Sequence, residues 1–449
     1  MAFSPLDSDL LSGLVGLPAM SAVFDDRATL AAMLRVEAAL ARAQASVGLV
    51  PAGLAAAIEA IGPDSLDIRA LGKATALSGV LPIPFVKTLQ ACLPAEFEKA
   101  VHFGATTQDI ADSAMALQMH AAFALLSTEL VATLAALAAM ADRHAATACI
   151  GRTYGQHAAP VSFGFKVAVW AAGIAEVARK LPSVRAEACR AQLGGPVGTL
   201  SALGDRAEAV VDTFAAELGL SRPSVAWHAR RANVAAAGQW LALLCGALAK
   251  MAGDVVALAS TEVGEVAEPH VPGRGGSSAM PHKRNPVSAT VILANAQAAG
   301  AHAASLVASL AAAHERPAGA WHGEWHSLAT LFGLAGGACM HARTLAEGLV
   351  VDVPAMARNI GATRGLVFAD AASAALAAKS GRAQAHAAVE AAATRVRASG
   401  GTLRDELAGL LDAADLDAAF DPGPAVSAAA ARVAPALAEV RAALAALSS

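Results

Sequence analysis

Apolar residues recur every three or four positions over long stretches of this chain, which is the pattern of helices with one buried face. Residues 24–48 show the pattern first, and Gly48 stands where that helix would end. A run over about residues 110–147 contains no proline or glycine, so it predicts a helix far longer than the globular average. Comparable runs cover about residues 162–191, 233–260, 286–314 and 328–349. Together these runs predict a bundle of long helices.

The run that follows Arg284 has no charged residue before Glu315, and its length alone would suffice to span a membrane. Asn285, Asn295 and His302 interrupt it, however, and alanine supplies much of the rest. A helix that is apolar on all sides is either a membrane span or a helix buried in a protein core. We expect a core helix, buried on most of its circumference inside the bundle, and no membrane partner.

Shorter predicted helices, broken by the sequence D-P-G-P, begin at about residue 353. The pattern therefore predicts an N-terminal helical domain over residues 1–109, a central bundle over 110–350 and a small helical domain over 351–449. A loop rich in glycine, serine and charged residues, 273–286, interrupts the central part.

The composition favours an all-α fold. Hydrophobic residues make up 56% of the chain but aromatic residues only 4%, so alanine and leucine, both strong helix formers, supply most of the apolar surface. The net charge is -4 and no basic run is present, which disfavours nucleic-acid binding. Small molecules are the expected partners.

Neither the cysteines nor the N-terminal segment points to export. The five cysteines lack C-x-x-C spacing, and their odd number disfavours a disulfide framework. The first residues include acidic side chains and lack the basic and apolar regions of a signal peptide. We therefore expect a cytoplasmic protein.

Two weak motifs do not support a cofactor. His322 and His326 have a spacing seen in zinc sites, but Glu324 lies two positions after the first histidine, whereas a metalloprotease helix has glutamate directly after it. The sequence G-R-G-G at 273–276 lacks the G-x-G-x-x-G pattern of dinucleotide binding. We predict neither a metal nor a nucleotide cofactor.

The segment H-F-G-A-T-T-Q-D has two interpretations. Thr106 and Asp109 have the spacing of a capping box, which satisfies amide groups at the start of a helix. The same helix start, with the hydroxyls of Thr106 and Thr107, also suits a substrate carboxylate, and Gly104 would let the substrate approach the backbone.

The segment G-R-T-Y-G-Q-H-A-A-P is a polar connection between two predicted helices. It is either an ordinary loop or a source of donors to a polar ligand, with Gln156 and His157 as the first candidates.

The segment G-G-S-S-A-M-P-H-K-R-N-P concentrates flexibility, hydroxyls and charge before a long helix. Asn285 stands where an N-cap is expected and Pro286 at the first helical position. Lys283 would add positive charge beside the free amides, so we predict a second carboxylate site that Ser277 and Ser278 face.

In this order, the three segments resemble the active-site segments of the fumarase/aspartase superfamily. The resemblance continues over nearly the whole chain through S-T-E-V-G-E-V-A-E-P and H-E-R-P-A-G-A-W-H-G-E-W-H-S-L, and is strongest to bacterial 3-carboxy-cis,cis-muconate cycloisomerases. It implies a three-domain all-α fold whose central five-helix bundles pack, in a homotetramer, into a twenty-helix core. It also implies that three subunits contribute residues to each active site and that no cofactor is used.

The resemblance also implies a role for each matching residue. Ser277 would be the general base that removes a proton alpha to a carboxylate, while Lys283 and Asn285 hold that carboxylate as its charge grows in an aci-carboxylate. Arg152 and His157 are expected to contact further carboxylates of the substrate. The residues implied to surround the substrate are Thr106, Thr107, Asp109, Arg152, Thr153, Tyr154, Gln156, His157, Ser278 and Met280.

Two positions depart from those relatives that expel hydroxide or an amine. Tyr154 stands where they carry a histidine, and Thr290 where they carry its glutamate partner. Expelling a strongly basic group requires a general acid. Opening a lactone releases a carboxylate with a pKa of about 4, which needs none. The departures favour reversible closure of 3-carboxy-cis,cis-muconate to 4-carboxymuconolactone, in protocatechuate degradation.

Three alternatives stay open. A nitrosuccinate lyase would also expel a weakly basic group, nitrite. An adenylosuccinate lyase shares P-H-K-R-N-P, but its leaving group fits Tyr154 and Thr290 less well. A catalytically silent structural protein would not require Ser277, Lys283 and Asn285.

Overall fold

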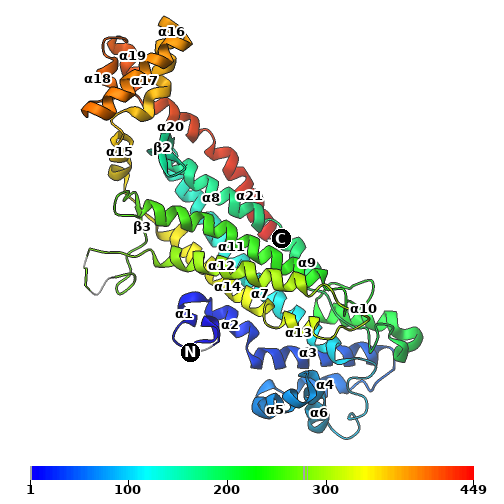
Figure 1. Cartoon of the computed structure of the whole chain (residues 1–449). Coiled ribbons are helices and arrows are strands. Elements are labelled where there is room, and N and C mark those ends of the chain that lie inside the picture. The colour runs from blue at the N-terminus through cyan, green and yellow to red at the C-terminus, as the bar shows by residue number, and fades with distance from the viewer. Residues whose placement is uncertain (1–2, 277–278, 281, 449) are drawn as a thin grey trace.

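The computed structural model describes residues 3–276, 279–280 and 282–448, and its long helices lie side by side in an elongated molecule (Figure 1). Within these residues, five long helices form the central bundle: α7 (Thr107–Arg143), α8 (Phe163–Ala178), α11 (Ala232–Leu258), α12 (Val287–Ala308) and α14 (Leu328–Gly348). Helix α11 packs on α8, α12 and α14, while α7 packs on α8 and α14. The predictions of an all-α fold and of a five-helix bundle are confirmed.

Shorter helices flank the bundle. Before α7 lie α1 (Ser12–Val15), α2 (Pro18–Phe24), α3 (Asp26–Ser46), α4 (Leu54–Glu59), α5 (Ile68–Ser78) and α6 (Pro82–Cys92). Between the long helices lie α9 (Leu181–Ala188), α10 (Ala207–Leu218) and α13 (Ala320–Glu324). After them follow α15 (Val353–Gly361), α16 (Ala369–Ser380), α17 (Arg382–Ser399), α18 (Leu403–Leu407), α19 (Ala413–Ala419), α20 (Gly423–Ala430) and α21 (Val433–Ser448).

Two of the predicted long helices have different bounds in the structure. The run over residues 162–191 forms two helices, α8 and α9, because Pro182 stands at the start of the second and cannot continue the first. Helix α12 begins at Val287 and ends at Ala308, six residues before the predicted end at His314.

A β-hairpin follows α7 where only a polar connection was predicted. Its strands are β1 (Ala148–Thr153) and β2 (Gln156–Ser162), antiparallel, with a bulge between Gly151 and Arg152. A second short pair joins β3 (Val266–Ala267) to β4 (Val350–Val351). The second pair brings the segment before the 273–286 loop against the end of α14.

The largest buried cluster follows the long helices and includes residues of α21, which packs along α7 and α8. Helices α16, α17, α18 and α19 enclose a separate apolar core of their own. The domain boundaries predicted from the sequence stay a prediction.

The N-terminal segment docks on the bundle through a close backbone approach. A Cβ atom at Gly337 of α14 would lie 1.9 Å from the carbonyl oxygen of Val15, so only glycine fits there. The same oxygen accepts a hydrogen bond from the Asn295 amide of α12 at 2.8 Å. One carbonyl therefore ties α1 to two bundle helices.

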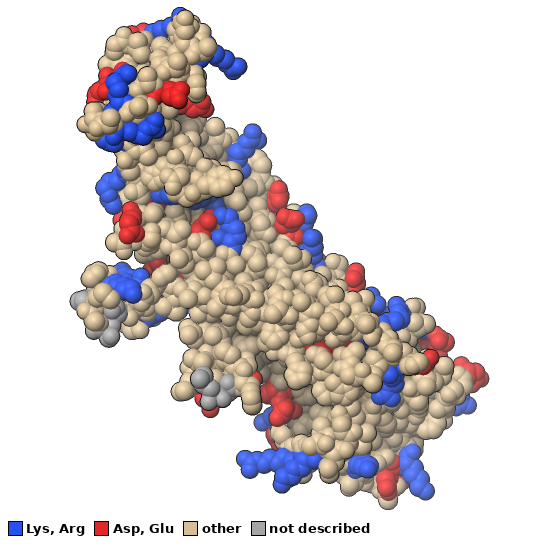
Figure 2. Space-filling view, in the orientation of Figure 1, with Lys and Arg blue, Asp and Glu red and all other residues tan. Residues whose placement is uncertain are grey.

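The long helices keep apolar faces outside the bundle core. Among the described helices, α7, α11 and α12 are long and apolar enough to cross a membrane by length and composition alone, and only 39%, 44% and 33% of their most apolar windows are buried. The prediction that α12 is buried on most of its circumference is therefore not met within one chain. Leu243 on α11 and Val307 on α12 are 58% and 44% exposed. Figure 2 shows a broad surface with few charged residues over the middle of the bundle.

Candidate active site

The start of α7 holds the first predicted group. The predicted capping box of Thr106 and Asp109 is confirmed, and in it the Thr106 amide donates to the Asp109 carboxylate at 2.9 Å. Asp109 is fully buried and also accepts from the Gly194 and Gly195 amides, each at 2.9 Å. His228 Nε2 lies 2.7 Å from its Oδ1. Both carboxylate oxygens of Asp109 thus have partners within the protein itself, and these contacts fix the start of α7.

Arg316 joins the two threonines, and the sequence analysis missed it. Its Nη1 donates to Thr106 Oγ1 at 2.8 Å and its Nη2 to Thr107 Oγ1 at 3.0 Å. No carboxylate is paired with Arg316 among the described residues. The available signal was its position as the first cation after the long uncharged run.

A buried charge cluster lies directly behind this helix start. Arg231 donates to Asp112 at 2.7 Å and to Glu324 at 2.5 Å, and its guanidinium stacks 4.6 Å from the Trp227 ring centre. Burial raises the pKa of Glu324, although Arg231 opposes that shift. Glu324 of the H-G-E-W-H motif is therefore part of an ion cluster that joins α13 to α7.

The β1–β2 hairpin holds the second group. Arg152 pairs with Glu265, as its Nη1 and Nη2 donate to the two carboxylate oxygens at 3.0 and 2.6 Å. Tyr154 lies at the turn with φ 51° and is fully exposed. Thr153 and Gln156 flank the turn and are exposed as well.

His157 follows on β2 with one buried ring nitrogen. Its Nδ1 has no hydrogen-bond partner among the described residues. Burial lowers the pKa of His157, and the charge of Arg152 lowers it further, against a smaller opposing effect of Glu265. The neutral imidazole is therefore favoured in this chain.

The 273–286 loop holds the third group, although Ser277 and Ser278 lie outside the described residues. The loop is closed at its base, where the Asn285 amide donates to the Gly275 carbonyl at 2.9 Å. Within it, the Lys283 amide donates to the Met280 carbonyl at 3.0 Å. Lys283 and Asn285 line a cavity of about 690 Å³ between this loop and residues 259–271.

The predicted cap of α12 is wrong. Pro286 occupies the N-cap position with non-helical angles, and Asn285 lies before it without a side-chain cap bond. Instead, the Glu268 carboxylate accepts from the amides of Ser288 and Ala289 at 3.0 and 2.9 Å. A carboxylate is favoured over a neutral amide at the positive end of a helix. These two amides are therefore occupied and do not form the predicted free site beside Lys283.

A buried network anchors the same loop to the bundle. Arg274 donates to the Ser288 hydroxyl and lies 3.1 Å from His341 Nδ1, while His341 Nε2 lies 2.7 Å from the Leu14 carbonyl oxygen. Burial lowers the pKa of His341, and Arg274 lowers it further. Residues on both sides of the loop are thus fixed by side chains of the bundle.

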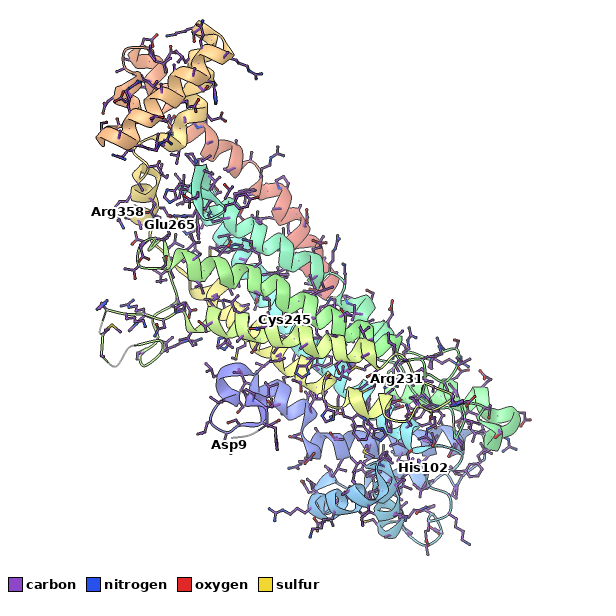
Figure 3. All side chains as sticks on the ribbon, in the orientation of Figure 1. Asp9, His102, Arg231, Cys245, Glu265 and Arg358 are labelled. Carbon is purple, nitrogen blue, oxygen red and sulfur yellow. The ribbon has the colours of Figure 1, made fainter. Side chains whose placement is uncertain are left out.

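One chain does not bring the three groups together. Figure 3 labels Glu265, the partner of Arg152, at one end of the bundle, and labels His102 and Arg231, which lie near the α7 start, at the other. The base of the 273–286 loop lies beside β3, at the same end of the bundle as Glu265 (Figure 1). Each group is locally ordered where it is described, but a site containing all three cannot form within a single chain of this shape.

An elongated all-α bundle with polar connecting loops is the architecture of the fumarase/aspartase class of enzymes. The chain matches the family described as Lyase over residues 15–300, and it belongs to that family. It is 43% identical over 411 residues to the 3-carboxy-cis,cis-muconate cycloisomerase of Bradyrhizobium diazoefficiens, covering 91% of this chain and 90% of the relative. It is also 42% identical over 436 residues to the nitrosuccinate lyase of Streptomyces davaonensis, covering 93% and 92%.

Solved structures agree with this assignment. The 3-carboxy-cis,cis-muconate lactonizing enzyme of Pseudomonas putida superimposes with a TM-score of 0.92 at 38% identity, over 97% of this chain and 99% of that one. The resemblance to the superfamily that the sequence motifs indicated is confirmed.

Proposed function

We propose that this chain is a 3-carboxy-cis,cis-muconate cycloisomerase that interconverts its substrate and 4-carboxymuconolactone in the cytoplasm. The observation that carries the proposal is Tyr154, which stands at the exposed hairpin turn where relatives that expel hydroxide or an amine carry a histidine. A carboxylate leaving group, with an ordinary pKa of about 4, departs without protonation. Similarity to cycloisomerases over nine-tenths of the chain supports the same activity.

In the proposed mechanism, Ser277 takes the proton on carbon alpha to a carboxylate of the lactone. The electrons move into that carboxylate, and Lys283 and Asn285 stabilise the added charge. The ring C–O bond then breaks and the second carboxylate departs. In the closing direction this carboxylate adds to the diene and Ser277 returns the proton to carbon.

Arg316 is proposed to bind a substrate carboxylate together with Thr106 and Thr107. Its cation lies beside the N-terminal end of α7, where the helix dipole is already positive, so a bound anion would relieve an unfavourable contact. Asp109 does not neutralise this cation by a direct ion pair, because its oxygens bind backbone amides and His228.

We further propose a homotetramer in which three subunits build each site. Two observations support it: the α7 start lies at the opposite end of the bundle from the hairpin and the base of the 273–286 loop, and the long helices expose apolar side chains such as Leu243. Packing the bundles of four chains together would bury those faces and bring different loops into one site.

Nitrosuccinate lyase is the second candidate. The relative of that name covers slightly more of this chain than the cycloisomerase does, and nitrite is a weakly basic leaving group that would tolerate Tyr154 equally well. An adenylosuccinate lyase fits less well, because its leaving amine requires a general acid.

The test follows the ultraviolet absorbance of 3-carboxy-cis,cis-muconate with wild type and with Ser277→Ala in parallel. We expect rapid loss of the diene signal with wild type alone. The same two proteins are given nitrosuccinate, with released nitrite as the measure. Release of nitrite without loss of the diene would replace the first candidate by the second, and turnover by Ser277→Ala would remove the serine from its role.

A further inference from the structure

Arg152 and Glu265 form a bidentate ion pair in which the carboxylate is completely buried. The side chain of Glu265 is 0% exposed and that of Arg152 is 17% exposed. The negative charge of Glu265 is therefore balanced mainly by this guanidinium. If Arg152 moved away to bind a substrate, the buried carboxylate would lose its charged partner. The structure therefore favours a state in which Arg152 and Glu265 stay paired.

Glu265 connects the hairpin to two other segments. Its Oε1 also accepts from the Asn359 amide of α15 at 2.8 Å, and its backbone oxygen accepts from the Asp352 amide at 2.9 Å. It directly precedes β3, the strand from which the chain continues into the 273–286 loop. One carboxylate thus fixes the hairpin relative to the C-terminal helices and to the loop entrance.

The hairpin turn has a backbone conformation that the surrounding structure must maintain. Its two central residues, Tyr154 and Gly155, have φ values of 51° and 74°. Glycine adopts such angles freely, but a tyrosine does so only at a conformational cost that the surrounding structure must sustain. Arg152 lies two residues before Tyr154, beside a β-bulge that directs the end of the strand.

We propose that Arg152 and Glu265 act as a pair of positioning residues that sets the Thr153–Gln156 turn and the direction of Tyr154, and that Arg152 does not bind substrate carboxylates. This assignment replaces the substrate contact expected for Arg152 from the sequence. Its kinetic consequence rests on the proposed function, but its structural consequence does not.

The chain contains a single tyrosine, Tyr154, so a label on tyrosine reports on this turn alone. Fluorotyrosine incorporated throughout the protein gives one fluorine resonance, from Tyr154. We expect Glu265→Gln and Arg152→Lys to shift or broaden this resonance in the intact oligomer. A matched control is the exposed ion pair of Arg395 and Glu406 in the C-terminal helices, whose variants Arg395→Lys and Glu406→Gln should leave the resonance unchanged.

Steady-state kinetics separate positioning from substrate binding. We expect each single variant to lower kcat roughly ten- to a hundredfold with KM within about threefold, because a misplaced group loses alignment rather than affinity. The double variant should lose no more than either single variant, since both changes remove one interaction. Conversion of both residues to methionine should keep the thermal stability and the low kcat, because a buried ion pair can be replaced by apolar groups without loss of folding.

Three results would overturn the proposal. The first is a fluorine resonance that neither Arg152→Lys nor Glu265→Gln moves. The second is a raised KM for Arg152→Lys with normal kinetics for Glu265→Gln, which would make Arg152 a substrate ligand. The third is wild-type turnover by the double methionine variant, which would leave the pair a purely structural role. If wild type turns over neither candidate acid, the proposed function fails, and the fluorine measurement still decides this proposal.

Discussion

Arg316 places a cation where a helix already presents positive charge. We predict that Arg316→Gln raises KM roughly ten- to a hundredfold with a smaller change in kcat, because losing a hydrogen bond to a charged group costs about 1.5–3 kcal/mol. Arg206→Gln is the control, since Arg206 is exposed and donates to the Val47 carbonyl at 3.0 Å. An unchanged KM with a lowered melting temperature would restrict Arg316 to holding the start of α7.

His102 and Glu37 give the protein a stabilising contact that depends on pH. Their nearest atoms lie 2.7 Å apart. Burial alone would lower the pKa of His102, but the Glu37 charge and hydrogen bond outweigh it and the pKa is raised. A raised folded-state pKa means stability that is complete below the unfolded pKa of about 6.5 and is lost as pH rises through the folded value.

The matching experiment compares wild type with His102→Gln. We expect the variant to lose more melting temperature at pH 5.5 than at pH 9, where the wild-type imidazole has lost its charge. Equal losses at both pH values would mean that the charge of His102 contributes nothing to folding.

For individual residues, the sequence indicated which side chains are chemically unusual but not which residues they contact. Arg152 was recognised, but Glu265 lies 113 positions away in the sequence. Arg316 was missed because its threonine partners lie 210 and 209 positions away. Such contacts depend on the fold, and no local spacing encodes them.

Among the elements, α14 depends on one glycine for its contact with the N-terminal segment. We predict that Gly337→Ala lowers the free energy of unfolding by about 1–3 kcal/mol, since the methyl group would overlap the Val15 carbonyl oxygen. Gly72→Ala on α5 is the control, because nothing lies within 4 Å of its Cβ position and alanine favours a helix interior by roughly 0.5–1 kcal/mol. Chemical denaturation measures both, and equal stability of the two variants would contradict the close approach.

Helix periodicity was sufficient to predict the bundle helices but not the segments that connect them. The 3.6-residue pattern predicted all five long helices because each buries one apolar face. It ran through Pro182, where the structure breaks the helix, and it gave no sign of the β1–β2 hairpin, whose strands are only six and seven residues long. The α12 cap was wrong because Glu268, 18 positions before Pro286, supplies a charged acceptor that local capping rules do not consider.

For the whole molecule, shared sites predict that two inactive variants restore each other. Ser277→Ala removes the proposed base, and the double variant Thr107→Val/Arg316→Gln removes the proposed carboxylate contacts. When the two chains are co-expressed and mixed oligomers are isolated, we expect about a quarter of the sites to be intact, because each site draws these groups from different chains at random.

Activity of the mixed oligomers is the measurement, with each variant alone as its control. Mixed tetramers that stay inactive would place both groups in the same chain of each site. A monomer in solution, measured by light scattering, would remove the shared site altogether.

The base of the 273–286 loop has a consequence for altering this enzyme. Gly275 and Asn285 close it by a backbone hydrogen bond, while Arg274 and Glu268 attach the flanking residues to the bundle. The residues between those anchors, apart from the proposed catalytic Ser277 and Lys283, can therefore be varied in sequence and number, because the free energy of closing a loop changes only slowly with its length. Libraries confined to this segment offer a route to new acid substrates on an unchanged scaffold.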